Sequence, residues 1–258
     1  MKNLFLLAGL PRSGSTLIGS ILSQNPDIFL ATQSPFIELL WRQYSLWGDK
    51  GWEIETSRLE KNKVPYLRST VDSYFDLMTD KDHVIDCRRH WHLVPNIKMY
   101  QEVFGISPKI LCPVRNVEEI MASYKNVFSA NKTPWNPETM DSQMFKLPYL
   151  SFKDAYNSKY RNCLLLVEYN KFVKSPMKVL EDIYKFLEIP SFEHDLKTIV
   201  ADEFYEDVDD YYNLKGLHKI SGAIVSSNTN AKTSLTIDQY GKFKELSFWN
   251  RGAIAHCL

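Results

Sequence analysis

The sequence has no surplus of charge of either sign, because its 31 lysine and arginine residues equal its 31 aspartate and glutamate residues. A chain with this balance is not expected to bind nucleic acid or an anionic membrane surface through its overall charge, although it can still contain a local basic cleft. No apolar run reaches the roughly 18–20 residues that a membrane-spanning helix needs. We therefore expect neither a nucleic-acid partner nor a membrane anchor.

Cysteine is also scarce, and its arrangement excludes two further classes of protein. The sequence has no C-x-x-C pair, and its four cysteines are Cys87, Cys112, Cys163 and Cys257. Three of them lie in apolar, strand-like runs, where a free thiol behaves as a small hydrophobe. We expect no disulfide framework and no metal site. The first apolar run leads directly into a glycine loop, so it is predicted to be a strand rather than a signal peptide, and the protein to be cytoplasmic.

What the sequence does contain is a strand-length apolar run, a glycine loop and a helix in immediate succession. Gly9 and Gly14 bracket the loop, and apolar residues recur at helical spacing from Leu17 to Leu22. Residues 9–16 have the form G-x-x-x-x-G-x-T, which differs from the phosphate-binding loop of nucleotide enzymes at one position. Such a layout presents backbone N–H groups and a helix N-terminus to a phosphate.

At the differing position, Ser15 replaces the usual lysine. In kinases and NTPases that lysine contacts the β- and γ-phosphates, so its loss argues against γ-phosphoryl chemistry. The loop amides, the helix dipole and the Arg12 guanidinium still favour an anionic ligand. The predicted ligand-binding residues of the loop are Arg12, Ser13, Gly14, Ser15 and Thr16. The alternative is a tight turn that uses its glycines for backbone reasons alone.

Strand-like and helix-like segments alternate along the chain, which predicts an α/β fold. The predicted strands are the first apolar run and residues 28–31, 83–87, 109–114 and 163–167. This order gives a three-layer fold like that of P-loop NTPases, with a central parallel sheet of about four to five strands flanked by helices. We expect residues 1–258 to form a single domain.

Three local predictions concern the connecting segments. Asn116 is predicted to cap the following helix, with Glu119 completing a capping box. Residues 131–150 contain three prolines and are predicted to be irregular, as a lid or an acceptor-binding segment. Residues 193–215 are acidic and are predicted to form a solvated face.

Several polar residues directly follow predicted strands. They are found in the loop at 9–16, in the basic cluster at 88–92, at Arg115 and at Tyr169. Ligands bind beyond the carboxyl ends of the strands in parallel sheets. We therefore expect these residues to gather at one rim and to form a single site.

Two motifs resemble those of a known family. Gly-Leu-Pro-Arg-Ser-Gly-Ser-Thr-Leu at 9–17 resembles the 5′-phosphosulfate loop of sulfotransferases, and the segment 114–123 resembles their 3′-phosphate segment. The family uses 3′-phosphoadenosine 5′-phosphosulfate (PAPS), has a fold related to P-loop kinases and lacks the kinase lysine. The resemblance implies that Arg115 and Ser123 hold the 3′-phosphate. The alternative is a surface arginine and a serine on a helix face.

Two further segments are similar to this family in a weaker way. The segment 167–176 is similar to the family's tyrosine segment at the end of a strand, which implies that Tyr169 contacts the adenine, although packing is the usual role of such a tyrosine. The segment 216–220 looks like a late loop that reaches the nucleotide phosphate. It makes Lys219 the predicted contact there, with His218 and Lys232 as further candidates.

The basic cluster supplies the predicted catalytic residues. The family places a cation after this strand to touch the bridging oxygen of the donor, and either Arg88 or Arg89 fits that position. One branch has its catalytic histidine two residues further on, which implies that His90 is the general base, with His92 and Glu38 in reserve. Other branches use a glutamate near the position of Gln33, which cannot act as a base. The alternative is that both histidines are structural.

The resemblance therefore implies a sulfotransferase that moves a sulfuryl group from PAPS to an acceptor hydroxyl without a metal and releases 3′-phosphoadenosine 5′-phosphate (PAP). The acceptor is expected to be a small molecule or a carbohydrate, ahead of a peptide, with residues 36–52 and 134–152 shaping its pocket. One rival is an ATP-dependent P-loop phosphotransferase, and another is a non-catalytic nucleotide-binding module. The sequence gives no indication of the oligomeric state.

Overall fold

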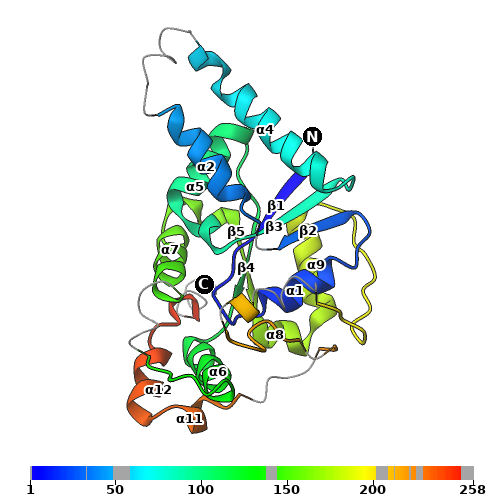
Figure 1. Ribbon diagram of the computed structural model, residues 1–258. Helices are drawn as coiled ribbons and strands as arrows, with labels where there is room; N and C mark the ends of the chain where they lie inside the picture. The colour runs from blue at the N-terminus through cyan, green and yellow to red at the C-terminus, as the bar shows by residue number, and fades with distance from the viewer. Residues whose placement is uncertain are drawn as a thin grey trace, which may run out of the picture.

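The computed structural model describes residues 2–32, 34–48, 59–137, 144–201, 209–211, 213–220, 222–224 and 229–250. Its centre is a five-stranded sheet in the order β2-β3-β1-β4-β5, in which every pairing is parallel (Figure 1). The strands are β1 (Asn3–Leu7), β2 (Ile28–Thr32), β3 (His83–Cys87), β4 (Ile110–Val114) and β5 (Leu164–Glu168). The predicted α/β class and parallel sheet are confirmed.

Helices cover both faces of the sheet, which confirms the three layers. On one face, α1 (Ser15–Leu22), α8 (Tyr169–Lys174) and α9 (Pro176–Leu187) contribute to a buried cluster with one side of the strands. The other cluster includes residues of α2 (Phe36–Leu46), α4 (Lys63–Met78), α5 (Val94–Phe104), α6 (Val117–Ala130) and α7 (Lys146–Tyr156). β1 alternates between the two, with Leu4 and Leu6 on one face and Phe5 and Leu7 on the other.

The remaining described elements are short. They are η1 (Leu59–Asn62), η2 (Arg89–His92), η4 (Lys159–Cys163), α11 (Ala231–Ser234), α12 (Ile237–Lys244) and η5 (Phe248–Asn250). In the described part of the chain, no helix has both the length and the apolar character needed to cross a membrane. Cys87, Cys112 and Cys163 are free thiols.

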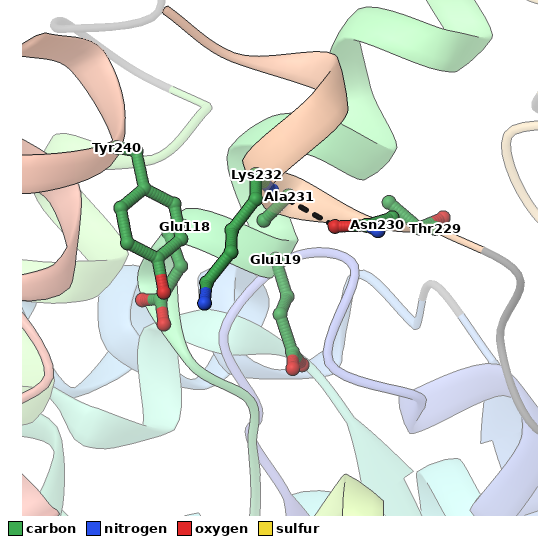
Figure 2. Close-up of a pocket in the computed structure, with 7 residues that line it drawn as sticks. All are labelled: Glu118, Glu119, Thr229, Asn230, Ala231, Lys232 and Tyr240. Atoms are coloured by element: carbon green, nitrogen blue, oxygen red, sulfur yellow. Dashed lines mark hydrogen bonds between the residues drawn. The ribbon is translucent and has the colours of Figure 1, made fainter. Parts of the chain in front are cut away.

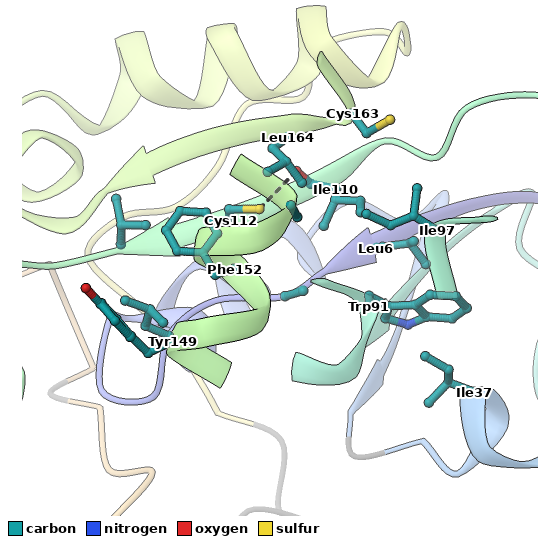
Figure 3. Close-up of a cluster of buried hydrophobic side chains, with 14 of the residues drawn as sticks. Leu6, Ile37, Trp91, Ile97, Ile110, Cys112, Tyr149, Phe152, Cys163 and Leu164 are labelled. Carbon is teal, nitrogen blue, oxygen red and sulfur yellow. Dashed lines mark hydrogen bonds between the residues drawn. The ribbon is translucent and has the colours of Figure 1, made fainter. Parts of the chain in front are cut away.

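Figure 3 shows part of the larger core, in which Trp91 and Phe152 are fully enclosed. One carboxyl group is enclosed with them, because Asp86 of β3 has no exposed surface and accepts a hydrogen bond of 2.6 Å from Trp91 Nε1. Burial disfavours the charged form and raises the pKa of Asp86 to about 7. This side chain therefore titrates near neutral pH.

Three local predictions about the connecting segments were only partly correct. Residues 131–137 are irregular as predicted and 138–143 lie outside the described residues, but residues 146–156 form α7. Pro148 fits this helix because it lies in the first turn, where its missing N–H has no intrahelical partner to lose. Asn116 occupies the N-cap position of α6, but its side chain does not cap the helix, because its side-chain oxygen Oδ1 instead accepts a hydrogen bond from the side-chain amide of Asn250. The acidic run is not wholly solvated, since Asp209 is 8% exposed.

Candidate functional site

The loop that follows β1 has an unusual backbone. Arg12 has a φ of 60° and Gly14 has a φ of 96°, both in the left-handed region, and α1 begins directly afterwards. The Ser13 hydroxyl donates to the carbonyl oxygens of Leu10 and Pro113, the latter at 2.8 Å, and thereby ties the loop to the end of β4. The N–H groups of the first turn of α1 have no intrahelical acceptors and are suited to an anion.

Close neighbours explain both glycines of the loop. A Cβ atom at Gly14 would stand 2.6 Å from Cδ2 of Tyr169, and one at Gly9 would stand 2.5 Å from Oγ of Ser15. Neither distance is possible between real atoms without movement. Gly14 therefore lets the ring of Tyr169, just after β5, lie directly against the loop, and Gly9 leaves room for Ser15 and Pro113.

The two sequence motifs meet at this loop. Nε of Arg12 donates to Oγ of Ser123 at 3.1 Å, although the two residues are 111 positions apart. The guanidinium of Arg115 lies over the ring of Tyr169, with 4.7 Å between its central carbon and the ring centroid. The ends of β1, β4 and β5 thus bring the predicted binding residues Arg12, Ser123, Arg115 and Tyr169 together.

Glu119 holds Arg115 in place from the first turn of α6. Its Oε2 accepts from Nε of Arg115 at 3.0 Å, and both its oxygens lie 3.2 Å from the side-chain amide nitrogen of Asn170. Arg115 is only 6% exposed, so this pairing is shielded from water. Sequence reasoning gave Glu119 a capping role and missed its contact with Arg115, which the spacing of four residues could have indicated.

The cluster is crowded with positive charge. Burial lowers the pKa of Arg12, and the nearby charge of Arg115 lowers it further, whereas Tyr124, Asp209 and Tyr169 oppose the shift. Arg89 belongs to the same neighbourhood, because Arg12 and Arg89 both act on the buried Tyr124 hydroxyl. An anion placed among these guanidinium groups would relieve their mutual repulsion.

Arg88 and His90 have a different partner. Arg88 donates to Oε1 of Glu38 on α2, and His90 Nδ1 lies 3.2 Å from the same oxygen. Burial is the largest influence on Glu38 and opposes its ionisation. The hydrogen bond and charge of Arg88, with hydrogen bonds from the backbone N–H of Glu38 and from His90, together outweigh it and hold the pKa of the carboxyl below its usual value. The side chain of His90 is 46% exposed. The consecutive arginines therefore serve different neighbours, and sequence spacing alone could not separate them.

A second histidine and carboxylate pair lies beside the loop. Nδ1 of His218 is 2.6 Å from Oδ1 of Asp209, and each side chain is 11% exposed. The backbone N–H of His218 donates to the other oxygen of Asp209 at 3.2 Å. Sequence reasoning had listed His218 as a phosphate contact and had missed Asp209, because the acidic run gave no sign that one of its members is buried.

A cavity of about 330 Å³ adjoins the site and has Glu119 in its wall (Figure 2). Its wall is formed by Glu118, Glu119, Thr229, Asn230, Ala231, Lys232 and Tyr240. Burial raises the pKa of Glu118 above its usual value. Lys232 projects from α11 toward the glutamates of α6.

The other predicted residues are more dispersed. Lys219 is exposed, and Gln33 lies outside the described residues. His92 is fully buried with its ring centroid 5.2 Å from that of Phe152, and burial lowers its pKa to about 3, so it remains neutral inside the core. Among the described residues, no group of three histidine, cysteine, aspartate or glutamate side chains could hold a metal ion.

A central parallel sheet with a glycine loop after its middle strand, and arginines around that loop, defines the P-loop-like α/β class of nucleotide-binding folds. Residues 5–194 match the model of the sulfotransferase family, and the chain belongs to this family. It is an enzyme that transfers a sulfuryl group. The comparison with curated protein sequences gave no match.

Two solved structures agree on the fold. A sulfotransferase from Alicyclobacillus acidocaldarius is similar over 86% of this chain and 98% of its own, with 16% identity and a TM-score of 0.50. A mouse sulfotransferase complexed with PAP is similar over 95% of this chain and 82% of its own, with 17% identity and a TM-score of 0.52. The predicted sulfotransferase fold is thereby confirmed.

Proposed function

We propose that this sulfotransferase takes its sulfuryl group from PAPS and holds the donor at both ends. The amides of residues 14–16 and the Arg12 guanidinium bind the 5′-phosphosulfate, while Ser13 braces the loop from within. Arg115 and Ser123 bind the 3′-phosphate, and the adenine lies near Tyr169. The observation that supports this most strongly is the 3.1 Å contact between Arg12 and Ser123, which joins the two motifs at one place.

The state of Arg115 suits a phosphate ligand. Its Nε is engaged by Glu119, and its plane lies on the ring of Tyr169, so the guanidinium is fixed before the ligand arrives. A fixed guanidinium presents its N–H groups to two phosphate oxygens at once and loses little conformational entropy on binding. Lys219 and Lys232 lie in the late segment of the chain, and they are proposed to add positive charge near the nucleotide.

Arg89 is proposed to support the leaving oxygen. Arg88 is committed to Glu38, whereas the charge of Arg89 reaches Tyr124 and His218 beside the loop. A cation at this position stabilises the negative charge that grows on the leaving phosphate as the bond to sulfur breaks.

The acceptor is proposed to be a hydroxyl group of a small molecule or a carbohydrate, ahead of a peptide. Aromatic residues on α2 are available to shape its pocket, since the rings of Trp41 and Tyr44 stack with their centroids 5.7 Å apart. Part of the second predicted acceptor segment, 138–143, lies outside the described residues. The predicted cytoplasmic location also stays a prediction.

Thermal stabilisation by nucleotides tests the donor site. PAP should raise the melting temperature well above the value with ADP, because only PAP has a 3′-phosphate for Arg115 and Ser123. Arg115→Ala should remove this difference by weakening PAP binding about 10- to 100-fold, the range expected for lost charge-assisted hydrogen bonds. The matched control is Arg42→Ala, since Arg42 is an exposed arginine on α2. Equal stabilisation by PAP and ADP in the unmodified protein would contradict the proposal.

The two rival functions make different predictions. A phosphotransferase would turn over ATP in a magnesium-dependent reaction, and the sulfotransferase family match disfavours it. A non-catalytic module would bind PAP and leave PAPS intact. Measuring PAP release from PAPS without added magnesium, and ATP turnover with added magnesium, separates all three.

A further inference from the structure

The pair formed by His218 and Asp209 has the geometry of a catalytic dyad. One carboxylate oxygen of Asp209 lies 2.6 Å from Nδ1 of His218, and the other accepts a hydrogen bond from the backbone N–H of His218 at 3.2 Å. Both the ring and the main chain of His218 are therefore fixed. With each side chain 11% exposed, little water competes for these bonds. A carboxylate on Nδ1 sets the tautomer so that Nε2 is the nitrogen that accepts a proton.

The dyad adjoins the positive groups of the donor site. The charge of Asp209 acts on Arg12 of the glycine loop, and the charges of Arg12 and Arg89 both act on His218. These are the two arginines proposed to face the phosphosulfate and its leaving oxygen. His218 therefore lies near enough to Arg12 and Arg89 for both charges to act on it.

His90, the base that the sequence predicted, is less suited to this task. Its carboxylate partner, Glu38, shares the same Oε1 with Arg88, which neutralises most of its charge. The side chain of His90 is 46% exposed, against 11% for His218. A shared and solvated carboxylate fixes a tautomer less firmly and stabilises an imidazolium less than a dedicated, buried one.

We propose that His218 is the general base of sulfuryl transfer and that Asp209 is its positioning residue, an inference that rests on PAPS being the donor. The acceptor oxygen bonds to the sulfuryl sulfur as the bond between that sulfur and the 5′-phosphate oxygen breaks. The electron pair of the broken bond leaves on PAP, and Nε2 of His218 takes the proton of the acceptor hydroxyl. The proton then passes to solvent.

The protonation state of His218 agrees with this role. Burial is the largest influence and lowers its pKa below the usual value; the charges of Arg12 and Arg89 add to the shift, and Asp209 opposes it. His218 is thus neutral at physiological pH and can accept a proton. Activity should fall as the pH drops through this pKa, because protonated imidazole cannot act as a base.

The test uses PAP release from PAPS with water as the acceptor, so it does not depend on the natural acceptor. His218→Asn should lower kcat by about 100-fold or more, the range for general-base catalysis, while the Kd for PAP stays unchanged. It should also remove the loss of activity at low pH. Asp209→Asn should shift that loss to lower pH, because His218 loses the carboxylate that raises its pKa. His83→Asn, at the amino end of β3, is the matched control and should retain the wild-type rate.

Several results would overturn the proposal. A wild-type rate in His218→Asn would exclude His218 as the general base. An unchanged kcat with weakened PAP binding would also exclude it and would make His218 a contact to the donor. Loss of the low-pH limb in His90→Asn but not in His218→Asn would assign the base to His90. If His218→Asn does not fold, His218→Gln and Asp209→Asn provide the same readouts. A wild-type protein that binds PAP but releases none from PAPS overturns the base and indicates the non-catalytic module, while it leaves the donor-binding residues as proposed. One that does not bind PAP overturns the donor assignment.

Discussion

Asp86→Asn is expected to change how the stability of this protein depends on pH. The carboxyl has a reference pKa of 3.8 and a pKa of about 7 in the fold, because it is buried without exposed surface beside Trp91. Between these values the folded state binds more protons than the unfolded state. The free energy of unfolding therefore falls as the pH rises through this window.

The structure gives the size of this effect. A difference of about three pKa units corresponds to about 4 kcal/mol across the whole window. From pH 5 to pH 8 the expected loss is about 3 kcal/mol, because about two pH units of this interval lie below the folded pKa of about 7. Asparagine can accept the hydrogen bond from Trp91 but cannot ionise, so the variant should lack this loss.

Urea unfolding at pH 5 and pH 8 measures the difference. Every other titrating group is common to the two proteins, so subtracting the change in the variant from the change in the wild type isolates Asp86. The wild type should lose about 3 kcal/mol more than the variant between the two pH values. Equal changes in both proteins would show that Asp86 is ionised throughout and would refute the reasoning from burial.

Two further substitutions test local geometry. Gly14→Ala should destabilise the fold by about 1–2 kcal/mol in urea unfolding and abolish stabilisation by PAP, because its φ is 96° and its Cβ would meet the ring of Tyr169. Gly241 lies in α12 with open space where a Cβ would stand, so Gly241→Ala should instead stabilise the fold. Equal changes in stability for the two glycine variants would contradict the argument. Thr236→Ala should remove the capping box of α12 and lower the free energy of unfolding by about 1 kcal/mol. Calorimetry should then show a Tm about 2–4 °C lower. An unchanged Tm would show that the capping hydrogen bonds do not stabilise the protein.

Much of the fold follows from local patterns in the sequence. The apolar strand runs, the glycine loop and the helical spacing from Leu17 onward predicted the order of elements, because each depends on neighbours close in the chain. Pro148 was misleading because proline breaks a helix in its interior but fits its first turn, and the difference of position cannot be seen without knowing where the helix begins.

The site was predictable where a strand end fixes a residue, and less so elsewhere. Arg12, Arg115 and Tyr169 follow parallel strands, so topology alone brings them to one rim. The consecutive Arg88 and Arg89 diverge within the short turn η2, which no spacing rule describes. Asp209 and His218 come from a segment without regular periodicity, and their contact depends on burial that composition does not reveal.

The strand order places different parts of the site toward the two opposite edges of the sheet, β2 and β5. The residues proposed to bind the 5′-phosphosulfate, the 3′-phosphate and the adenine follow β1, β4 and β5 in the chain, and Arg89, proposed to support the leaving oxygen, follows β3. In contrast, α2 and α4 lie between β2 and β3 in the sequence, toward the β2 edge of the sheet. Substitutions in α2 and its surroundings can therefore change the acceptor that binds, while the residues proposed to bind the nucleotide stay the same. In such an architecture the same donor can be used with many different acceptors. The sequence differences that select the acceptor are expected near the β2 edge of the sheet.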